Sequence, residues 1–239
     1  RENFDLEHVL EFTVEAGSPD SITREKLEVI RKYPVTRISV NPQTMQQKTL
    51  DLVGRKHTVE DVEQIFHLAR ELGFDNINMD LIMGLPEEDL DDVRHTLEEI
   101  EALRPDSLTV HSLAIKRAAR LNMFKEEYGG LKINNTPEKI AMSEACARRL
   151  GMEPYYLYRQ KNMAGNFENV GYSLPGKACI YNILIMEELQ TIAACGAGTT
   201  TKVVFPAENR RERCENVKEV EQYISRIDEM IGRKERILG

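Results

Sequence analysis

The sequence predicts an α/β protein in which parallel βα units are followed by a small antiparallel and helical extension. Short β-rich runs alternate with amphipathic helical segments over the first 114 residues, which is typical of a parallel sheet covered by helices. After residue 151 the β-rich runs are separated only by Gly-rich or polar turns, and this spacing favours antiparallel pairing. The parallel strands are expected at residues 9–16, 35–41, 76–83 and 107–114.

Two of the helices between these strands have clear start and stop signals. Thr58 and Asp61 have the spacing of a capping box, and Gly73 follows the last apolar residue of the same segment. The next helix begins after Pro86 with a run of acidic residues, which suit the positive end of a helix dipole. We expect this acidic run, which includes Glu88, to be a solvated helix start.

The second half of the chain is predicted from weaker signals. A helix is expected from Thr136, where Thr-Pro-Glu is a typical helix start, to Gly151. Strands are expected at residues 155–160, 181–189 and 192–204. A final helix is predicted from an apolar stripe at helical spacing, formed by Val220, Tyr223, Ile224, Ile227 and Ile231.

The charge and hydropathy of the chain exclude several classes of protein. Its formal net charge is −8, which disfavours nonspecific nucleic-acid binding through a basic face. No run approaches the roughly 20 apolar residues that cross a bilayer, and no charged and then apolar leader begins the chain. We therefore expect a cytoplasmic protein that binds neither nucleic acid nor membrane.

The four cysteines are too far apart in the sequence to form a recognisable metal site or a disulfide framework. They are Cys146, Cys179, Cys195 and Cys214, and they lack CxxC or CxxxCxxC spacing. We expect reduced, mostly structural thiols and no metal bound by this chain. Glycine-rich dinucleotide and P-loop motifs are also absent from the sequence.

Polar side chains stand near the expected ends of the parallel strands. Glu15 ends the first strand, Gln43 follows the second and Asp80 lies in the third, while Arg55 comes after a short helix. Because the carboxyl ends of parallel strands meet at one edge of a sheet, these groups are expected to lie close together. Two carboxylates, an amide and a guanidinium suit a zwitterionic nucleoside better than a polyphosphate. Each acid alone also fits a helix cap or a solvated loop.

The histidines and tyrosines have a simpler structural interpretation. His57 and His111 have no metal-ligand partner at helical or strand spacing, so we interpret them as structural or solvated side chains. Tyr155, Tyr156 and Tyr158 are expected to pack on a strand without contacting a ligand. None of these residues is included in the predicted site.

A resemblance to a known family is carried by two strings, ISVNPQTMQQKTLDLVGRKHTVEDV at residues 38–62 and INMDLIMGLPEEDLDDV at residues 77–93. They resemble the radical S-adenosylmethionine enzymes of the oxygen-independent coproporphyrinogen III oxidase (coproporphyrinogen dehydrogenase) family. In that family a strand ending in Gln is followed by L-x-x-x-x-R, and a later D-L-I-x-G-L-P closes the next strand. The resemblance covers residues 8–115 well and residues 136–204 loosely.

The resemblance implies a fold, two cofactors and a set of site residues. The fold is a partial (β/α)6 barrel that binds S-adenosylmethionine at its strand ends and a [4Fe-4S] cluster through three cysteines in CxxxCxxC. By motif position, Glu15, Gln43, Arg55 and Asp80 would contact S-adenosylmethionine, and Ala114 would lie near its adenine or near a second bound copy. The resemblance identifies no catalytic residue in this chain.

The resemblance also implies an activity in haem and porphyrin biosynthesis. Reductive cleavage of S-adenosylmethionine, with electrons from a donor, gives a 5′-deoxyadenosyl radical that takes hydrogen from two propionates of a tetrapyrrole substrate. The propionates then lose carbon dioxide and become vinyl groups. Close relatives of the family are haem chaperones, so a haem-binding protein on the same scaffold is the alternative, and an inactive domain fragment is a further one.

The chain departs from the family pattern because it has neither CxxxCxxC nor the Gly-rich stretch of the second family strand. We therefore expect a truncated part of a longer enzyme, with βα units 3 to 6 of the barrel at residues 1–115 and a family-specific extension at residues 116–239. The isolated chain is expected to be inactive. Its first strand would expose an unpaired apolar edge, which predicts self-association there.

Overall fold

The structure is a computed structural model, and it describes residues 6–114, 132–159 and 163–239. The chain forms two compact units, Arg1–Cys179 and Ile180–Gly239, which we describe separately. The predicted division after residue 115 follows the family resemblance and stays a prediction. Two strands beyond that point nevertheless extend the sheet of the first unit.

The first unit contains a six-stranded mixed sheet with the strand order β1-β2-β3-β4-β6-β5. The first four strands are parallel, as predicted, and β5 and β6 are antiparallel additions beside β4. The strands are β1 (Thr13–Val14), β2 (Arg37–Ser39), β3 (Ile77–Met83), β4 (Ser107–Ser112), β5 (Glu153–Tyr158) and β6 (Asn169–Ser173). The carboxyl ends of the four parallel strands therefore share one edge.

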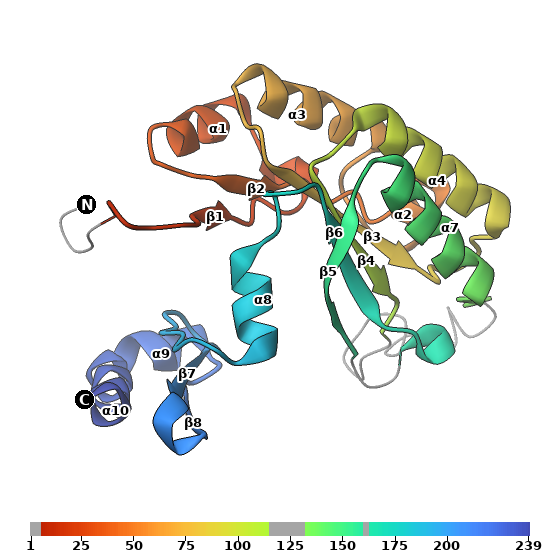
Figure 1. The fold of residues 1–239 in the computed structure, drawn as a ribbon. Helices are drawn as coiled ribbons and strands as arrows, with labels where there is room; N and C mark the ends of the chain where they lie inside the picture. Colours follow the sequence, from red (N-terminus) through yellow and green to blue (C-terminus); the bar gives the residue numbers. More distant parts are fainter. Residues whose placement is uncertain (1–5, 115–131, 160–162) are drawn as a thin grey trace. The chain divides into compact units, whose positions relative to one another are not determined.

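Four described α-helices of the first unit lie on one side of this sheet (Figure 1). They are α1 (Arg24–Arg31), α3 (Val59–Glu71), α4 (Leu90–Leu103) and α7 (Pro137–Arg149), while the short helix α2 (Gln47–Leu52) comes between β2 and α3. The predicted capping box of Thr58 and Asp61 is confirmed at the start of α3, and Asp89 and Asp92 form a second one at the start of α4. Thr136 caps α7 through the backbone amide of Lys139.

The core lies between the helices and one face of the sheet, which we call the helix face. Its residues come from alternate positions of β2, β3 and β4 and from the strand ends, as expected for strands with one face against helices. They are Ile38, Val40, Ile77, Met79, Leu81, Leu108 and Val110. Helix residues such as Leu27, Phe66, Leu97 and Ala147 pack against them. The opposite positions of the same strands form the polar face described below.

The second unit combines helices with a two-stranded antiparallel hairpin. Its elements are α8 (Ile180–Glu187), β7 (Thr200–Phe205), β8 (Arg210–Glu215), α9 (Val220–Ser225) and α10 (Ile227–Leu238). The turn between β7 and β8 contains Asn209 at φ 47°, a left-handed conformation that asparagine tolerates. This hairpin agrees with the expected antiparallel extension.

Three predictions for the second unit are wrong in detail. Residues 181–189 form most of helix α8, because a short continuous apolar run has no periodicity that separates a strand from a buried helix. Within 192–204 only the segment from Thr200 onward is a strand, and Ile192 makes a single bridge to Lys202. The final helix is broken at Arg226, and its predicted apolar stripe is exposed, with Ile224 at 67% exposure.

The first strand is also much shorter than predicted. Only Thr13 and Val14 pair with β2, although residues 9–16 were expected to form a strand. Val9 and Leu10 are exposed and precede the paired segment. The strand does lie at the edge of the sheet, as expected, so the predicted association at this edge remains a prediction.

Candidate functional site

The face of the sheet opposite the helix face carries a layer of polar side chains. Alternation along β3 puts Asn78 and Asp80 on this polar face, and alternation along β4 puts Thr109 and His111 there. Asp80 is paired in register with Thr109, and Ile82 with His111. His111 therefore lies one layer nearer to the carboxyl edge of the sheet than Thr109 does.

Asn78 holds one oxygen of the Asp80 carboxylate in place. Its Nδ2 donates to Asp80 Oδ1 over 2.7 Å. Its Oδ1 accepts hydrogen bonds from Ser107 Oγ at 3.0 Å and from Thr109 Oγ1 at 3.3 Å. Because Asn78 is buried and bonded at both ends of its amide, it cannot turn away from Asp80 without losing several bonds.

The other oxygen of Asp80 faces a histidine. His111 Nε2 lies 3.6 Å from Asp80 Oδ2, and both side chains are partly exposed, at 27% and 22%. On the far side of the imidazole, Tyr158 Oη lies 3.4 Å from His111 Nδ1. Three strands, β3, β4 and β5, thus bring an acid, an imidazole and a phenol into one row.

These contacts decide the charge of Asp80. Burial raises the pKa of the Asp80 carboxyl, but interactions with His111 and a hydrogen bond from Asn78 outweigh burial and hold the pKa below its ordinary value. Asp80 is therefore ionised at neutral pH and acts as a hydrogen-bond acceptor. An ionised acceptor on a strand suits a ligand that presents hydroxyl or ammonium groups.

Gln43 lies directly beside Asp80 at the carboxyl edge. Its backbone amide donates to the carbonyl of Asp80 over 3.0 Å, and its own carbonyl accepts from the amide of Ile82 at 2.9 Å. Gln43 has φ 69°, a left-handed conformation that costs about 1 kcal/mol or more in residues other than glycine. Such strain is often found at functional positions, and here it accompanies a residue of the predicted site.

A buried polar network supports the segment that follows Gln43. Thr44 Oγ1 donates to Glu88 Oε1 over 2.6 Å and contacts Thr96 Oγ1 at 3.2 Å. The ammonium of Lys139 on α7 donates to the carbonyl of Glu88 over 2.6 Å. Glu88 was expected to be part of a solvated helix start, and this expectation is wrong. It is buried, because the chain turns inward before α4 begins.

Glu88→Gln is expected to raise the free energy of unfolding at neutral pH by about 1 kcal/mol, because the amide oxygen still accepts from Thr44 while no charge is buried. Burial raises the pKa of Glu88 in the folded protein, so the native state favours the protonated acid and its ionisation costs stability as pH rises. The gain should therefore disappear near pH 4, where unfolded glutamate is protonated.

Urea unfolding at pH 7 and pH 4 measures this difference between the Glu88→Gln variant and the unaltered chain. Glu98→Gln is the matched control, since Glu98 is exposed on α4. At each pH the stability of Glu88→Gln is compared with that of the unaltered chain. If this difference is less favourable to the variant at pH 7 than at pH 4, the carboxylate itself is required in the network.

Glu15 is brought to the same edge, but its carboxylate already has a partner. Arg37 Nη1 lies 3.4 Å from Glu15 Oε1. Glu15 comes directly after β1, and Arg37 is the first residue of the adjoining strand β2. The Arg37 residue is only 2% exposed, and its Nε has no hydrogen-bond partner. The buried Asn41 Oδ1, two residues before Gln43, also lacks one.

The remaining predicted residues are placed differently. Ala114 continues β4 at the carboxyl edge, where it bridges to Met163. Arg55 is exposed after α2, and in the described parts of the chain no ion pair joins its side chain to the other site residues. The structure thus brings Gln43 and Asp80 into direct backbone contact and places Glu15 and Ala114 at the same edge. Their roles as ligand contacts stay predictions.

The two histidines have different surroundings. His57 is buried, with Nε2 3.2 Å from the carbonyl of Pro42 and Nδ1 3.2 Å from Ser18 Oγ, so the structural interpretation is confirmed. His111 contacts Asp80, and sequence reasoning missed this role. The only signal was its position on a strand end next to the strand of Asp80.

The tyrosines of β5 also reach the polar face. The ring of Tyr156 lies across Gly171 of β6, so closely that an added Cβ would sit 1.9 Å from the ring. Tyr156 and Tyr158 have nearly parallel rings with centroids 6.1 Å apart. Packing is therefore confirmed as expected, but Tyr158 additionally contacts His111, a residue of the site.

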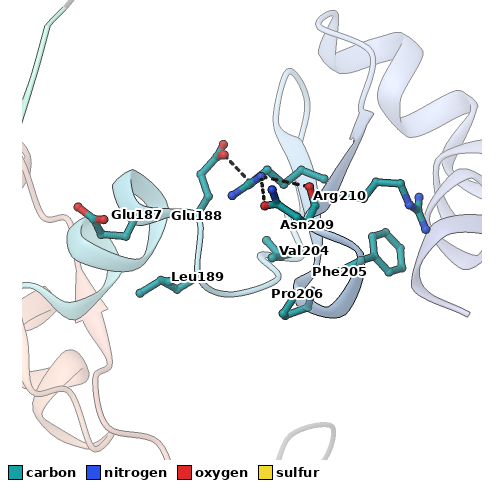
Figure 2. A pocket seen from close by; sticks show the side chains of 9 residues that line it. Glu187, Glu188, Leu189, Val204, Phe205, Pro206, Asn209 and Arg210 are labelled. Carbon is teal, nitrogen blue, oxygen red and sulfur yellow. Dashed lines mark hydrogen bonds and ion pairs between the residues drawn. The ribbon is translucent and has the colours of Figure 1, made fainter.

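A separate hollow of about 220 Å³ lies in the second unit beside the β7–β8 hairpin. Glu188 and Asn209, which line it (Figure 2), already have an arginine partner. Arg211 Nε lies 2.8 Å from Glu188 Oε2, and Arg211 Nη1 donates to Asn209 Oδ1 over 3.1 Å. The guanidinium of Arg210 stacks on the ring of Phe205. The hollow is small for a drug-sized ligand. The pKa of its acid Glu188 is lowered by Lys202 and neighbouring arginines, which already pair with this carboxylate.

The cysteines do not converge on a metal site. Across residues 6–114, 132–159 and 163–239, no group of three histidine, cysteine or acidic residues is placed to hold a metal ion. Burial raises the pKa of the Cys146 thiol to about 12, so it remains a neutral thiol. The described residues therefore do not fit a [4Fe-4S] cluster, which needs three thiolates close together.

The polar face fits S-adenosylmethionine better than it fits a cluster. The ionised Asp80 offers an acceptor for hydroxyl or ammonium groups, and the orphaned Asn41 Oδ1 offers a second one near Gln43. Buried polar atoms without partners are rare in folded proteins, and they are expected where a ligand completes the bonding.

Within the described segments, no helix is both long and apolar enough to cross a bilayer.

Comparison with known proteins gives consistent matches. A family model described as the radical SAM superfamily matches residues 4–100. The oxygen-independent coproporphyrinogen-III oxidase-like protein HemZ of Bacillus subtilis is 46% identical over 98% of the chain and 47% of its own length. The haem chaperone HemW of the same organism is 31% identical over 64% of the chain and 40% of its own length.

The fold is also found in a solved structure. Coproporphyrinogen III oxidase (HemN) from Escherichia coli aligns with a TM-score of 0.64 at 20% identity, over 92% of this chain and 49% of that chain. The mixed α/β fold with a small antiparallel hairpin is thereby confirmed. The chain spans about half the length of the relatives that it matches.

Proposed function

This chain belongs to the HemN/HemZ-like coproporphyrinogen III oxidase family of radical SAM proteins and corresponds to part of its longer members, and from that membership we propose that it carries an S-adenosylmethionine site for tetrapyrrole chemistry. The proposed reaction is the oxidative decarboxylation of propionate side chains of a coproporphyrinogen-type substrate to vinyl groups, in which each side chain loses a hydrogen atom, carbon dioxide and one electron, the last to a separate one-electron acceptor. The chain acts in this proposal as part of a longer, cytoplasmic protein that also receives electrons from a donor.

The observation that carries the proposal is the ionised Asp80 on the polar face beside Gln43. Asp80 accepts hydroxyl or ammonium hydrogen bonds from the ligand, and the Gln43 amide adds a donor and an acceptor. Glu15 contributes a second carboxylate, steadied by Arg37. Ala114 lines the same edge without a polar group, and Arg55 is the counter-charge for a ligand carboxylate.

S-adenosylmethionine, when bound next to a reduced cluster, supplies the carbon radical that removes hydrogen from the substrate. The residues of this chain bind and orient the cofactor. Because the described cysteines do not fit the cluster, we propose that its ligands lie in a part of the longer protein to which this chain does not correspond. The isolated chain is accordingly expected to be inactive.

The test uses the longer protein after anaerobic reconstitution with iron and sulfide. It is incubated with coproporphyrinogen III, S-adenosylmethionine and a reductant, and released carbon dioxide and vinyl products are measured. Substrate-dependent carbon dioxide release supports the proposal. If the longer protein binds S-adenosylmethionine but releases no carbon dioxide, the decarboxylation is excluded while the cofactor site stands.

A haem chaperone on the same scaffold is the second candidate, because the relatives named haem chaperone HemW share 26–31% identity with the chain. The lower identity and shorter coverage than those of HemZ favour the oxidase-like function. Stoichiometric haem binding by the longer protein, followed through its absorption spectrum, together with the absence of decarboxylation would favour the chaperone.

Self-association through β1 is proposed as a further property of the same chain. The strand pairs on one side only, and Val9 and Leu10 just before it are exposed. An unpaired edge of this kind pairs readily with another strand. A monodisperse monomer in light scattering of the chain would count against this association.

A further inference from the structure

We propose that His111 is a positioning residue of the site: together with Tyr158 it holds the Asp80 carboxylate toward the ligand and makes ligand affinity depend on the protonation of its imidazole. The inference rests on the proposed function, because it concerns the same carboxylate. The comparisons assign no role to His111 or Tyr158. Three side chains on β3, β4 and β5 form the row that carries this role: Asp80, His111 and Tyr158.

The register puts the imidazole where it can influence a ligand. Asp80 pairs with Thr109, and His111 lies one layer further toward the carboxyl edge. Ligands of parallel α/β sheets gather at that edge. His111 therefore lies beside Asp80 on the side of the carboxyl edge, and it contacts the carboxylate oxygen that Asn78 leaves unbonded.

The donors and acceptors of the row agree with a neutral imidazole. A neutral imidazole donates from one nitrogen and accepts at the other. When Tyr158 Oη donates to Nδ1, the proton of the ring is on Nε2 and points at Asp80 Oδ2. The polar contacts then run in one direction, from phenol to imidazole to carboxylate, and the carboxylate keeps its full negative charge.

Protonation of the imidazole changes this arrangement. Both ring nitrogens then donate, so Tyr158 has to accept, and the positive ring offsets the charge of Asp80. A ligand that presents hydroxyl, ammonium or sulfonium groups to Asp80 meets a weaker acceptor and a nearby positive charge. Affinity is therefore expected to rise with pH as His111 loses its proton.

Among the described residues, the groups around His111 come from three strands. β3 presents Asp80, which is already ionised, and β5 presents Tyr158, with Tyr156 stacked beside it. Burial raises the pKa of Tyr156, so this phenol stays neutral. On its other side, β6 presents Asn169 and Gly171, which carry no charge.

The first test needs no ligand. The nitrogen chemical shifts of the His111 ring, which show which nitrogen carries the proton, are measured by NMR in the chain labelled at histidine nitrogens, and the measurement is repeated in the Asp80→Asn variant. Loss of the carboxylate that lies 3.6 Å from Nε2 is expected to reduce the fraction of rings protonated on Nε2. Asp228→Asn, on the exposed first turn of α10, is the control and should leave the shifts unchanged. Unchanged shifts in Asp80→Asn would overturn the inference.

The second test measures S-adenosylmethionine binding to the longer protein by calorimetry from pH 5.5 to 8.5. The His111→Phe variant is expected to bind S-adenosylmethionine about tenfold more weakly than the unaltered protein at pH 8. Its affinity should no longer change with pH. His111→Gln keeps an N–H donor for Asp80, so it should recover most of the affinity but remain independent of pH. His95→Gln, a partly exposed histidine of α4, is the matched control.

The outcomes separate the two proposals. If the unaltered protein binds no S-adenosylmethionine at any pH, the proposed function fails and so does the ligand role of His111, even where NMR shows the coupling to Asp80. If the cofactor binds and His111→Gln keeps the original pH dependence, the inference alone is overturned. The far-ultraviolet circular dichroism of each variant shows that it is folded.

Discussion

Replacing Asp80 with alanine is expected to weaken S-adenosylmethionine binding by the longer protein about 10- to 100-fold. The carboxylate is ionised and held by Asn78 and His111, so its removal takes away a charge-assisted hydrogen bond worth roughly 1.5–3 kcal/mol. The side chain is partly exposed and packs on the polar face, away from the core, so the fold should tolerate the change.

Isothermal titration calorimetry of the Asp80→Ala variant measures this loss, and thermal unfolding of the same sample shows whether the fold is kept. Asp80→Asn separates charge from shape, because the amide fills the same space but no longer offers two acceptor oxygens. Asp228→Asn is the control, since Asp228 lies exposed at the start of α10. An unchanged dissociation constant in both Asp80 variants would make Asp80 a structural residue only.

Leu81, the next residue along β3, is expected to show the opposite behaviour. Its side chain is fully buried at 0% exposure in the core between the helices and the helix face. Leu81→Ala should lower the free energy of unfolding by about 2–5 kcal/mol, through lost burial and the cavity that remains. Neighbouring residues of one strand are thus expected to act separately, Asp80 in binding and Leu81 in stability.

Urea unfolding of the chain measures the effect of Leu81→Ala. The control is Leu157→Ala, a leucine on β5 that is 64% exposed, which should change stability by less than about 0.5 kcal/mol. Comparable losses in the two leucine variants would contradict the assignment of the helix face. So would a strong loss of stability in Asp80→Ala that matches that of Leu81→Ala.

The sequence predicted the parallel half of the fold well because its signals are local. The apolar runs of β2, β3 and β4, the capping box at Thr58 and the stop at Gly73 all act within a few residues. Strand β8 was missed because its sequence RRERCE shows almost no apolar alternation. Strand β6 was missed too: it is a short segment without an obvious pattern, whose place depends on pairing with both β4 and β5.

The residues of the candidate site were likewise predicted only in part. Gln43 and Asp80 were predicted from their places near strand ends, and the structure puts them in backbone contact. Glu88 was misread, because an acid before a helix looks solvated unless one knows that Thr44 and Lys139 fold against it. Burial of that kind depends on segments about 45 and 50 residues away, which no local pattern reports.

By itself, the sequence determined where three of the four parallel strands lie and which acid interrupts a buried run, because hydrophobic periodicity and helix caps act between near neighbours. Only the tertiary structure decided which side chains meet on the polar face. His111 was interpreted as a lone histidine, and it becomes a partner of Asp80 and Tyr158 only through the register of β3 with β4 and the addition of β5 to the same sheet. Strand register is set by pairing between distant segments, so its consequences for charge and binding appear only in the folded chain.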